Sequence, residues 1–128
     1  MKILEIPFVG YPFTDIIRTR KFYEEVLGLE PSMIVEIDEE KHQFWIEYNI
    51  GQSCLALSNA WSPVGSKDGP AAALEVDDID KALAELKEAG VSVESAIMAS
   101  PVCRFFLFAD PDGNPLCMHQ MNPGESSH

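Results

Sequence analysis

The chain has 128 residues, of which 46% are hydrophobic and 23% charged, a composition typical of one ordinary globular domain. Its 21 acidic residues against 9 lysines and arginines give a formal charge of −12, and no basic cluster favours nucleic acid or an anionic membrane as a partner. No apolar run reaches the ~18 residues that span a bilayer, and no signal peptide opens the chain, so we expect a cytoplasmic protein. The negative charge would attract a cationic small molecule, although solubility alone explains it equally well.

The cysteine pattern argues against a zinc knuckle or a redox pair. Cys54, Cys103 and Cys117 are odd in number, widely spaced and without a CxxC motif. We therefore expect reduced thiols in a reducing compartment.

The first half of the chain predicts one helix among four strands. The apolar, partly β-branched segment 3–11 predicts a strand. Asp15 is typical of an N-cap, and the helix that it starts is expected over 16–27 and to end at Gly28. The remaining strands of this half are expected at 33–38, 43–48 and 53–58.

The second half repeats the same order after a loop rich in Ser, Pro, Gly and Asp, residues 59–69, which is typical of a linker. A strand is expected at 71–76, and Asp78 predicts the N-cap of a helix over 79–89 that Gly90 ends. Further strands are expected at 91–95, 104–109 and 116–120, with a turn at 110–114 and a disordered tail at 122–128.

This internal repeat predicts the fold class. Each half reads strand, Asp-capped helix, glycine stop and three strands, and the repeat covers nearly the whole chain. We expect an α+β fold in which two tandem βαβββ modules form a curved mixed sheet around a cup, with the helices on the outer face. One domain, 1–121, would contain both modules, about 1–60 and 70–121.

Three motifs in this order resemble the vicinal oxygen chelate superfamily, which includes glyoxalases, bleomycin resistance proteins and extradiol dioxygenases. The first is the helix 15–29 with its FYEEVLGL ending, the second is EVDDID at 75–80 leading to Gly90, and the third is DPDGN at 110–114. The resemblance covers residues 1 to about 120. It implies two βαβββ modules that assemble within one chain or across a dimer, a homodimer of this two-module chain, and in the family's enzymes a divalent metal held by His and Glu side chains from four strands.

The positions that the resemblance implies for those metal ligands read Phe8, Ala56, Ala71 and Cys117 in this sequence. Three of these side chains have no donor atom, and one thiol does not make a hard-metal site. We therefore expect no metal and no other cofactor at the inherited positions. A relocated site remains an alternative, built on Glu75 and His119 with Glu47 or His42 from the middle strands.

Strand alternation predicts which side chains line the cup. The helix-covered face should be uniformly aliphatic, whereas the cup face should mix small, aromatic and polar residues, as a small-molecule pocket does. The predicted cup face comprises Ile6, Phe8, Gly10, Cys54, Ala56, Ser58, Ala71, Ala73, Glu75, Cys117 and His119. The predicted helix-covered face comprises Leu55, Leu57, Ala72, Leu74, Val76, Leu116 and Met118.

Aromatic residues near the middle strands are candidate pocket walls, with Trp61 the strongest because it opens a polar loop. Arg104 is a candidate for meeting an anionic group at the rim, although a surface ion pair is the simpler interpretation. The predicted ligand-binding residues are Phe8, Trp45, Tyr48, Ala56, Trp61, Ala71, Glu75, Arg104, Cys117 and His119.

Three functions are compatible with these observations. The first is a metal-independent, homodimeric binding protein resembling the bleomycin-resistance branch, which sequesters a hydrophobic or cationic aromatic ligand. The second is a glyoxalase-type lyase or isomerase, or a dioxygenase, that uses a displaced metal site or acid–base chemistry by Glu75 and His119. In the third, the cup is vestigial and the domain only dimerises. The sequence favours the first.

Overall fold

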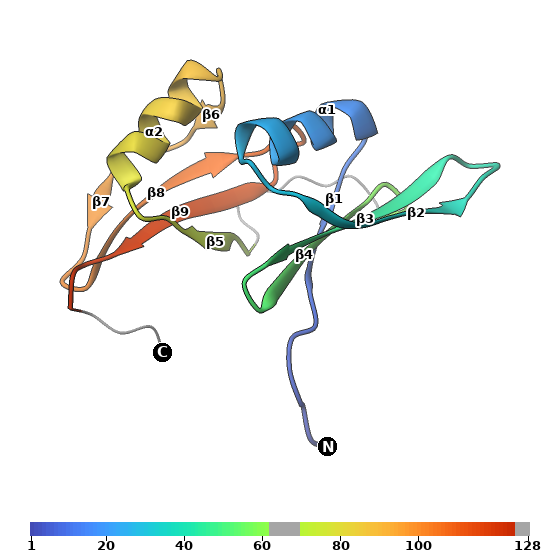
Figure 1. Ribbon diagram of the computed structural model, residues 1–128, viewed down its shortest axis with the longest axis horizontal. Coiled ribbons are helices and arrows are strands. Elements are labelled where there is room, and N and C mark those ends of the chain that lie inside the picture. Colours follow the sequence, from blue (N-terminus) through green and yellow to red (C-terminus); the bar gives the residue numbers. More distant parts are fainter. Residues whose placement is uncertain (62–69, 125–128) are drawn as a thin grey trace. The chain divides into compact units, whose positions relative to one another are not determined.

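The computed structural model describes residues 1–61 and 70–124, which cluster into two compact units (Figure 1). The units are Met1–Val64 and Gly65–His128. Each contains one helical segment and one mixed sheet, so the predicted α+β class is confirmed. Most of the predicted linker, 62–69, and the end of the predicted tail, 125–128, lie outside the described residues. No helix in the described part of the chain is long and apolar enough to cross a membrane.

The first unit has a four-stranded sheet in the order β1-β4-β3-β2, in which β1 and β4 are parallel and the other pairs antiparallel. Its elements are β1 (Val9–Pro12), α1 (Ile16–Arg20), η1 (Lys21–Val26), β2 (Pro31–Asp38), β3 (Gln43–Ile50) and β4 (Ser53–Ser58).

The helical segment of this unit begins and ends at the residues that the sequence indicated. The Asp15 carboxylate accepts hydrogen bonds from the backbone N–H groups of Ile17 and Arg18, at 3.0 and 3.2 Å. Gly28 has a φ of 74°, the left-handed conformation expected after a helix end. The helix predicted over 16–27 is confirmed, and its second half, η1, is a π-helix with wider turns.

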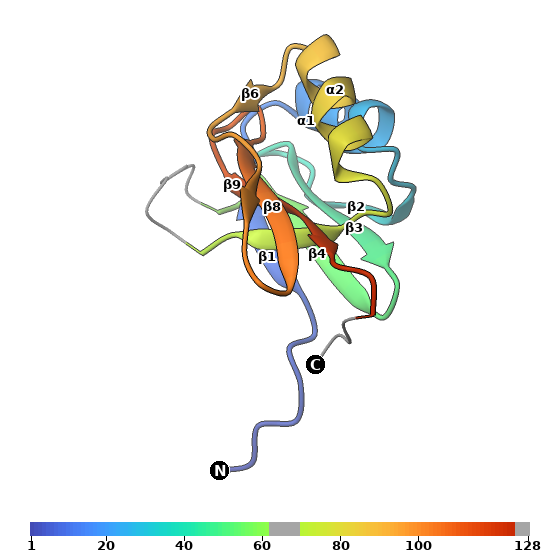
Figure 2. The ribbon, with the colours of Figure 1, turned by 90° about the vertical axis from the view of Figure 1, so that its left-hand side faces the viewer.

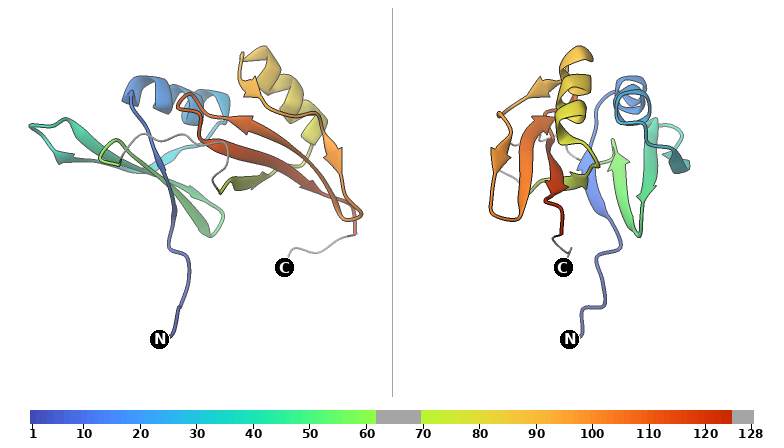
Figure 3. Two further views of the ribbon diagram at one scale, coloured as in Figure 1. Left: turned by 180° about the vertical axis from the view of Figure 1, so that it is seen from behind. Right: turned by 60° about the vertical axis from the view of Figure 1, so that its left-hand side comes forward.

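The strand predicted over 3–11 is also wrong at its start, because only Val9–Pro12 pairs. Val9 lies opposite Leu55, so Pro7 would face Ser53, where β4 begins. Proline has no N–H to donate to a ladder, and earlier residues would have no β4 residue to pair with. The segment before β1 accordingly extends away from the sheet (Figure 3).

One face of the sheet is covered by the helical segment, and this face carries the core of the unit. The Tyr23 ring stacks on the Tyr48 ring with centroids 5.7 Å apart, and both side chains are fully buried. Other buried apolar residues of this unit are Tyr11, Phe13, Phe22, Ile46, Leu55, Ala56 and Leu57.

A charged residue anchors the helical segment to this core. The Glu24 carboxylate accepts a hydrogen bond from Arg20 Nε at 2.7 Å and another from the buried Tyr48 hydroxyl at 2.9 Å. The hydrogen bond from Arg20 is the main cause that holds the pKa of Glu24 below its ordinary value. The Tyr48 pKa is raised, chiefly by burial.

We expect Glu24→Gln to remove part of the loss of stability at low pH. A carboxylate with a lowered folded-state pKa stabilises the fold above its unfolded-state pKa, and this contribution disappears as the pH falls through the folded-state pKa. The wild type should lose about 1 kcal/mol more than Glu24→Gln across that interval, because the pair is partly exposed. Urea unfolding as a function of pH measures this difference, with exposed Glu25→Gln as the matched control. If the free energy of unfolding fell equally with decreasing pH in the wild type and in Glu24→Gln, the prediction would be wrong.

The second unit repeats the topology of the first, with strand order β5-β9-β8-β6 and β7 paired to β8. β5 and β9 are parallel, as β1 and β4 are, so the predicted βαβββ repeat is confirmed within each unit. Its elements are β5 (Ala72–Glu75), α2 (Ile79–Glu88), β6 (Ser92–Val93), β7 (Met98–Ala99), β8 (Cys103–Ala109) and β9 (Pro115–Met121).

Helix α2 lies on one face of this sheet (Figure 2). Asp78 caps it through Lys81 N–H at 3.0 Å, and Gly90 follows it with a φ of 76°. The strand predicted over 91–95 is shorter than expected and β7 was not expected, since two-residue strands carry too little periodicity to detect. The buried apolar residues of this unit are Ile79, Leu86, Cys103, Phe106, Phe108, Ala109, Leu116 and Met118. Phe106, Phe108, Leu116 and Met118 lie on the face that α2 covers, because they alternate with Cys117 and His119.

Candidate functional site

Three aromatic rings gather on the face of the first sheet that the helical segment leaves uncovered. Trp45 lies on that face because it alternates with Ile46 and precedes buried Tyr48 by three positions along β3. Its ring centroid lies 5.3 Å from that of Phe8 and 5.1 Å from that of Trp61. Phe8 and Trp61 are nearly parallel, with centroids 6.4 Å apart. We call Phe8, Trp45 and Trp61 the aromatic cluster.

Small residues in the neighbouring strands make room for this cluster. Gly10 in β1 lies opposite Ala56 in β4, and Ala56 is fully buried. A Cβ at Gly10 would lie 2.5 Å from Cη2 of Trp61, closer than carbon atoms approach one another. The Trp61 ring therefore occupies the space that the missing side chain leaves, which explains why glycine stands in this strand.

A carboxylate borders the aromatic cluster. Glu47 lies in β3 opposite Ala56, on the same face as Trp45. Its Oε2 accepts a hydrogen bond from Trp45 Nε1 at 2.7 Å, and its Oε1 lies 3.6 Å from the Cys54 thiol. Burial, together with this carboxylate, raises the pKa of Cys54, so the thiol stays protonated and donates to Glu47.

Beside the cluster, the first unit has an open groove of about 490 Å³. Phe8 forms part of its wall, Glu5 and Glu47 contribute carboxylates, and no lysine or arginine of residues 1–61 and 70–124 lines it. The groove and the cluster therefore place an apolar surface next to negative charge. The sequence interpretation did not assign Glu5 or Glu47 to ligand binding, although the i, i+2 spacing from Trp45 would have placed Glu47 on the cup face.

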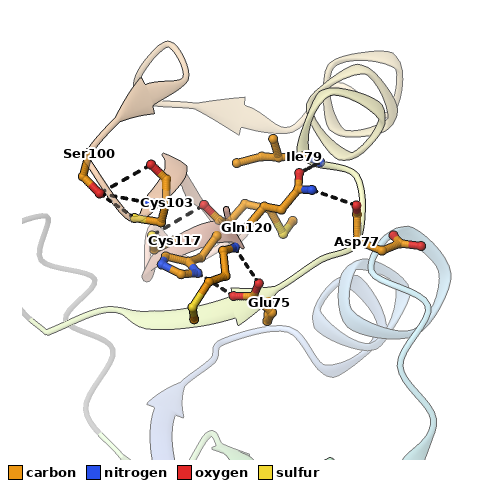
Figure 4. Close-up of polar contacts among 10 residues, drawn as sticks. Glu75, Asp77, Ile79, Ser100, Cys103, Cys117 and Gln120 are labelled. Carbon is orange, nitrogen blue, oxygen red and sulfur yellow. Dashed lines mark hydrogen bonds and ion pairs between the residues drawn. The ribbon is translucent and has the colours of Figure 1, made fainter. Parts of the chain in front are cut away.

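In the second unit, Glu75 and His119 lie together on the sheet face away from α2. β5 and β9 pair them directly, and His119 Nδ1 is 2.5 Å from Glu75 Oε1. The second oxygen of Glu75 accepts the backbone N–H of Met121 at 2.7 Å, as Figure 4 shows around the labelled Glu75. Cys117 lies on the same face, two residues before His119.

Two of the predicted ligand-binding residues, Tyr48 and Arg104, lie on the helix-covered side of their sheets. Tyr48 is fully buried against Tyr23, so it belongs to the core and not to a pocket wall. Arg104 lies on the α2 side, where its guanidinium binds Asp80 at 3.1 Å and Gln120 at 3.2 Å. The ion pair considered for Arg104 is therefore present. Ala71 is exposed just before β5.

The donor set does not fit the metal of the family's enzymes. Phe8, Ala56 and Ala71 have no donor atom, and burial raises the pKa of the Cys117 thiol, which disfavours the thiolate that binds metal. Among residues 1–61 and 70–124, no three His, Cys, Asp or Glu side chains gather closely enough to hold an ion.

Comparisons with known proteins place the chain in a family. The model of the Glyoxalase/Bleomycin resistance protein/Dioxygenase superfamily matches residues 5–118. No curated protein sequence matches the chain.

Solved structures of the same fold cover almost the whole chain. A glyoxalase family protein from Enterococcus faecalis is 25% identical with a TM-score of 0.71, covering 90% of this chain and 96% of its own. A glyoxalase/bleomycin resistance protein from Streptomyces sp. CB03234 is 26% identical with a TM-score of 0.70, covering 87% and 96%. TnmS3, an antibiotic binding protein from the same organism, has a TM-score of 0.75 at 24% identity, covering 95% and 99%, which supports the fold alone. The resemblance found in the sequence is confirmed, and the chain belongs to the glyoxalase/bleomycin resistance protein/dioxygenase superfamily.

Proposed function

We propose that the protein binds a small aromatic cation, without a metal, at the aromatic cluster and the groove of its first unit. The observation that carries this proposal is the contact of three aromatic rings beside the Glu47 carboxylate, on the sheet face opposite the helical segment. Such a site offers ring faces for stacking and a negative group for the charge of the ligand.

The energetics favour a cationic ligand over an anionic or purely apolar one. A cation over an indole face gains about 0.5–2 kcal/mol, depending on how far it is desolvated. The groove beside the cluster contains the carboxylates of Glu5 and Glu47 and, among the described residues, no basic side chain. The formal charge of −12 adds long-range attraction that raises the rate of encounter.

The family supports binding as a function, and the donor set supports the proposal that this binding needs no metal. One solved structure of this fold is described as an antibiotic binding protein, and another as a glyoxalase/bleomycin resistance protein. Sequestration of an aromatic cation by this chain would be the same kind of activity. The alternative function, an enzyme with a relocated metal site, would need a cluster of at least three donor side chains, and the described residues contain none.

We also propose that the protein is a homodimer and acts in the cytoplasm. The family resemblance implies the dimer. Free thiols at Cys54, Cys103 and Cys117 support a reducing compartment. Light scattering coupled to size-exclusion chromatography tests the dimer, which a monomeric mass would contradict.

Calorimetric titration with N-methylquinolinium tests the binding proposal. Quinoline, which is neutral at neutral pH and nearly the same shape, is the matched control ligand. We expect saturable binding of the cation, and about tenfold weaker binding of quinoline because the ring faces and carboxylates then have no charge to attract. Equal affinities for the two compounds would contradict the role of the positive charge in binding. Absence of binding of either compound would contradict the proposed site. Unchanged binding after dialysis against a chelator is expected, and lost binding would contradict metal independence.

A further inference from the structure

The Glu75–His119 pair in the second unit has a geometry that ligand binding in the first unit does not use. We propose that His119 is a catalytic base whose Nε2 takes a proton from water for the hydrolysis of a small activated ester, with Glu75 as its positioning residue. The proposal goes beyond the proposed function and does not depend on it.

The position of the imidazole proton follows from its partner. Burial alone would raise the pKa of Glu75, but the hydrogen bonds from the Met121 N–H and His119 together lower it by more. The pKa of Glu75 therefore lies below its ordinary value, and the group is a carboxylate. A carboxylate only accepts hydrogen bonds. At 2.5 Å from Glu75 Oε1, Nδ1 must therefore carry the proton, which leaves the lone pair of neutral His119 on Nε2.

Glu75 is itself held in place, so it fixes the orientation of the ring. Its Oε2 accepts the Met121 N–H at 2.7 Å, and the neighbouring Val76 N–H donates to the His119 carbonyl at 2.9 Å. These two bonds join β5 to β9 next to the pair. A histidine oriented by a fixed carboxylate is the arrangement that general bases use.

The side chains next to the pair on the same face are small or apolar. The next residues on the same face are Ala73 and Cys117, which face each other across β5 and β9. Phe105 lies opposite His119 on β8 and offers an apolar neighbour. Burial raises the pKa of the Cys117 thiol, so it does not compete as a nucleophile. Of the His119 side chain, 27% is exposed, which lets water reach this face.

The reaction balances without a cofactor. Nε2 takes a proton from water as the water oxygen bonds to the acyl carbon, and Glu75 stabilises the imidazolium that forms. When the bond between the acyl carbon and the alcohol oxygen breaks, the imidazolium returns its proton to that oxygen. Ester and water thus become acid and alcohol, and His119 is neutral again.

Three readouts on the full chain test the proposal. The ¹⁵N shifts of His119 should report the Nδ1–H tautomer in the wild type and lose this signature in Glu75→Gln. Diethyl pyrocarbonate, mapped by mass spectrometry, should modify His119 about tenfold faster than exposed His42. Hydrolysis of 4-nitrophenyl acetate should fall about tenfold in both His119→Gln and Glu75→Gln. His42→Asn, which keeps a residue suited to the φ of 52° there, should hydrolyse the ester like the wild type.

The outcomes separate this proposal from a structural ion pair and from the ligand site. The proposal would be overturned if neutral His119 carried its proton on Nε2, or if His119→Gln hydrolysed the ester as fast as the wild type. Slower ester hydrolysis in both His119→Gln and Glu75→Gln, with unchanged amide spectra, would support it. Binding of N-methylquinolinium should persist in both variants. Failure of the ligand site in the wild type with intact esterolysis would therefore contradict the proposed function and leave this inference standing.

Discussion

Trp61→Ala should weaken the binding of N-methylquinolinium about tenfold or more, because it removes one of three ring faces and widens the site. The fold should tolerate the change, since the Trp61 side chain is only partly buried and lies at the surface of the sheet. Calorimetric titration measures the affinity, and thermal unfolding measures the Tm. A large fall in Tm with unchanged affinity would mark Trp61 as a core residue and contradict its role in the site.

Gly10→Val offers an independent route to the same result. The new side chain would need the space held by the Trp61 ring, whose Cη2 lies 2.5 Å from the position of a Cβ at Gly10. We expect Trp61 to be displaced and the affinity to fall as in Trp61→Ala. Both tryptophans of the chain belong to the aromatic cluster, so tryptophan emission reports the displacement directly. Unchanged emission in Gly10→Val would contradict the packing.

The elements that the sequence predicts well are those with strong local signals. Asp15 and Asp78 cap the helices, and the alternation that separates Leu116 and Met118 from Cys117 and His119 agrees with their burial. Both signals act within a few residues of the chain, where side-chain chemistry decides the backbone conformation. The resemblance to the family rests on the same local motifs.

The errors occur where distant residues decide the structure. Residues 3–6 have strand-like composition but no β4 residue to pair with, and composition carries no information about partners. Tyr48 has the residue type of a pocket wall, yet its odd spacing from Trp45 places it under the helical segment. The approach of Trp61 to Gly10 joins residues far apart in sequence, so no periodicity indicates it.

Asp110→Ala should lower the free energy of unfolding by about 3 kcal/mol or more, the largest effect on stability that we expect here. Asp110 is only 5% exposed, and its carboxylate accepts hydrogen bonds within the turn between β8 and β9. Its Oδ1 accepts the N–H groups of Asp112 and Asn114, both at 2.9 Å, and its Oδ2 accepts Asn114 Nδ2 at 2.7 Å. Each donor left unpaired in a buried position costs about 1–3 kcal/mol.

Asp110→Asn separates the hydrogen bonds from the packing of this turn. The amide oxygen of the variant can replace Oδ1, but its NH₂ group then faces Asn114 Nδ2, and two donors meet where a donor met an acceptor. We therefore expect the free energy of unfolding of Asp110→Asn, measured in urea, to lie between those of the wild type and Asp110→Ala. The turn joins the two strands that carry buried Phe108 and Leu116, so the loss extends to the core of the second unit. A loss below about 1 kcal/mol in Asp110→Ala would show that the backbone of the turn, and not its carboxylate, holds these strands in register.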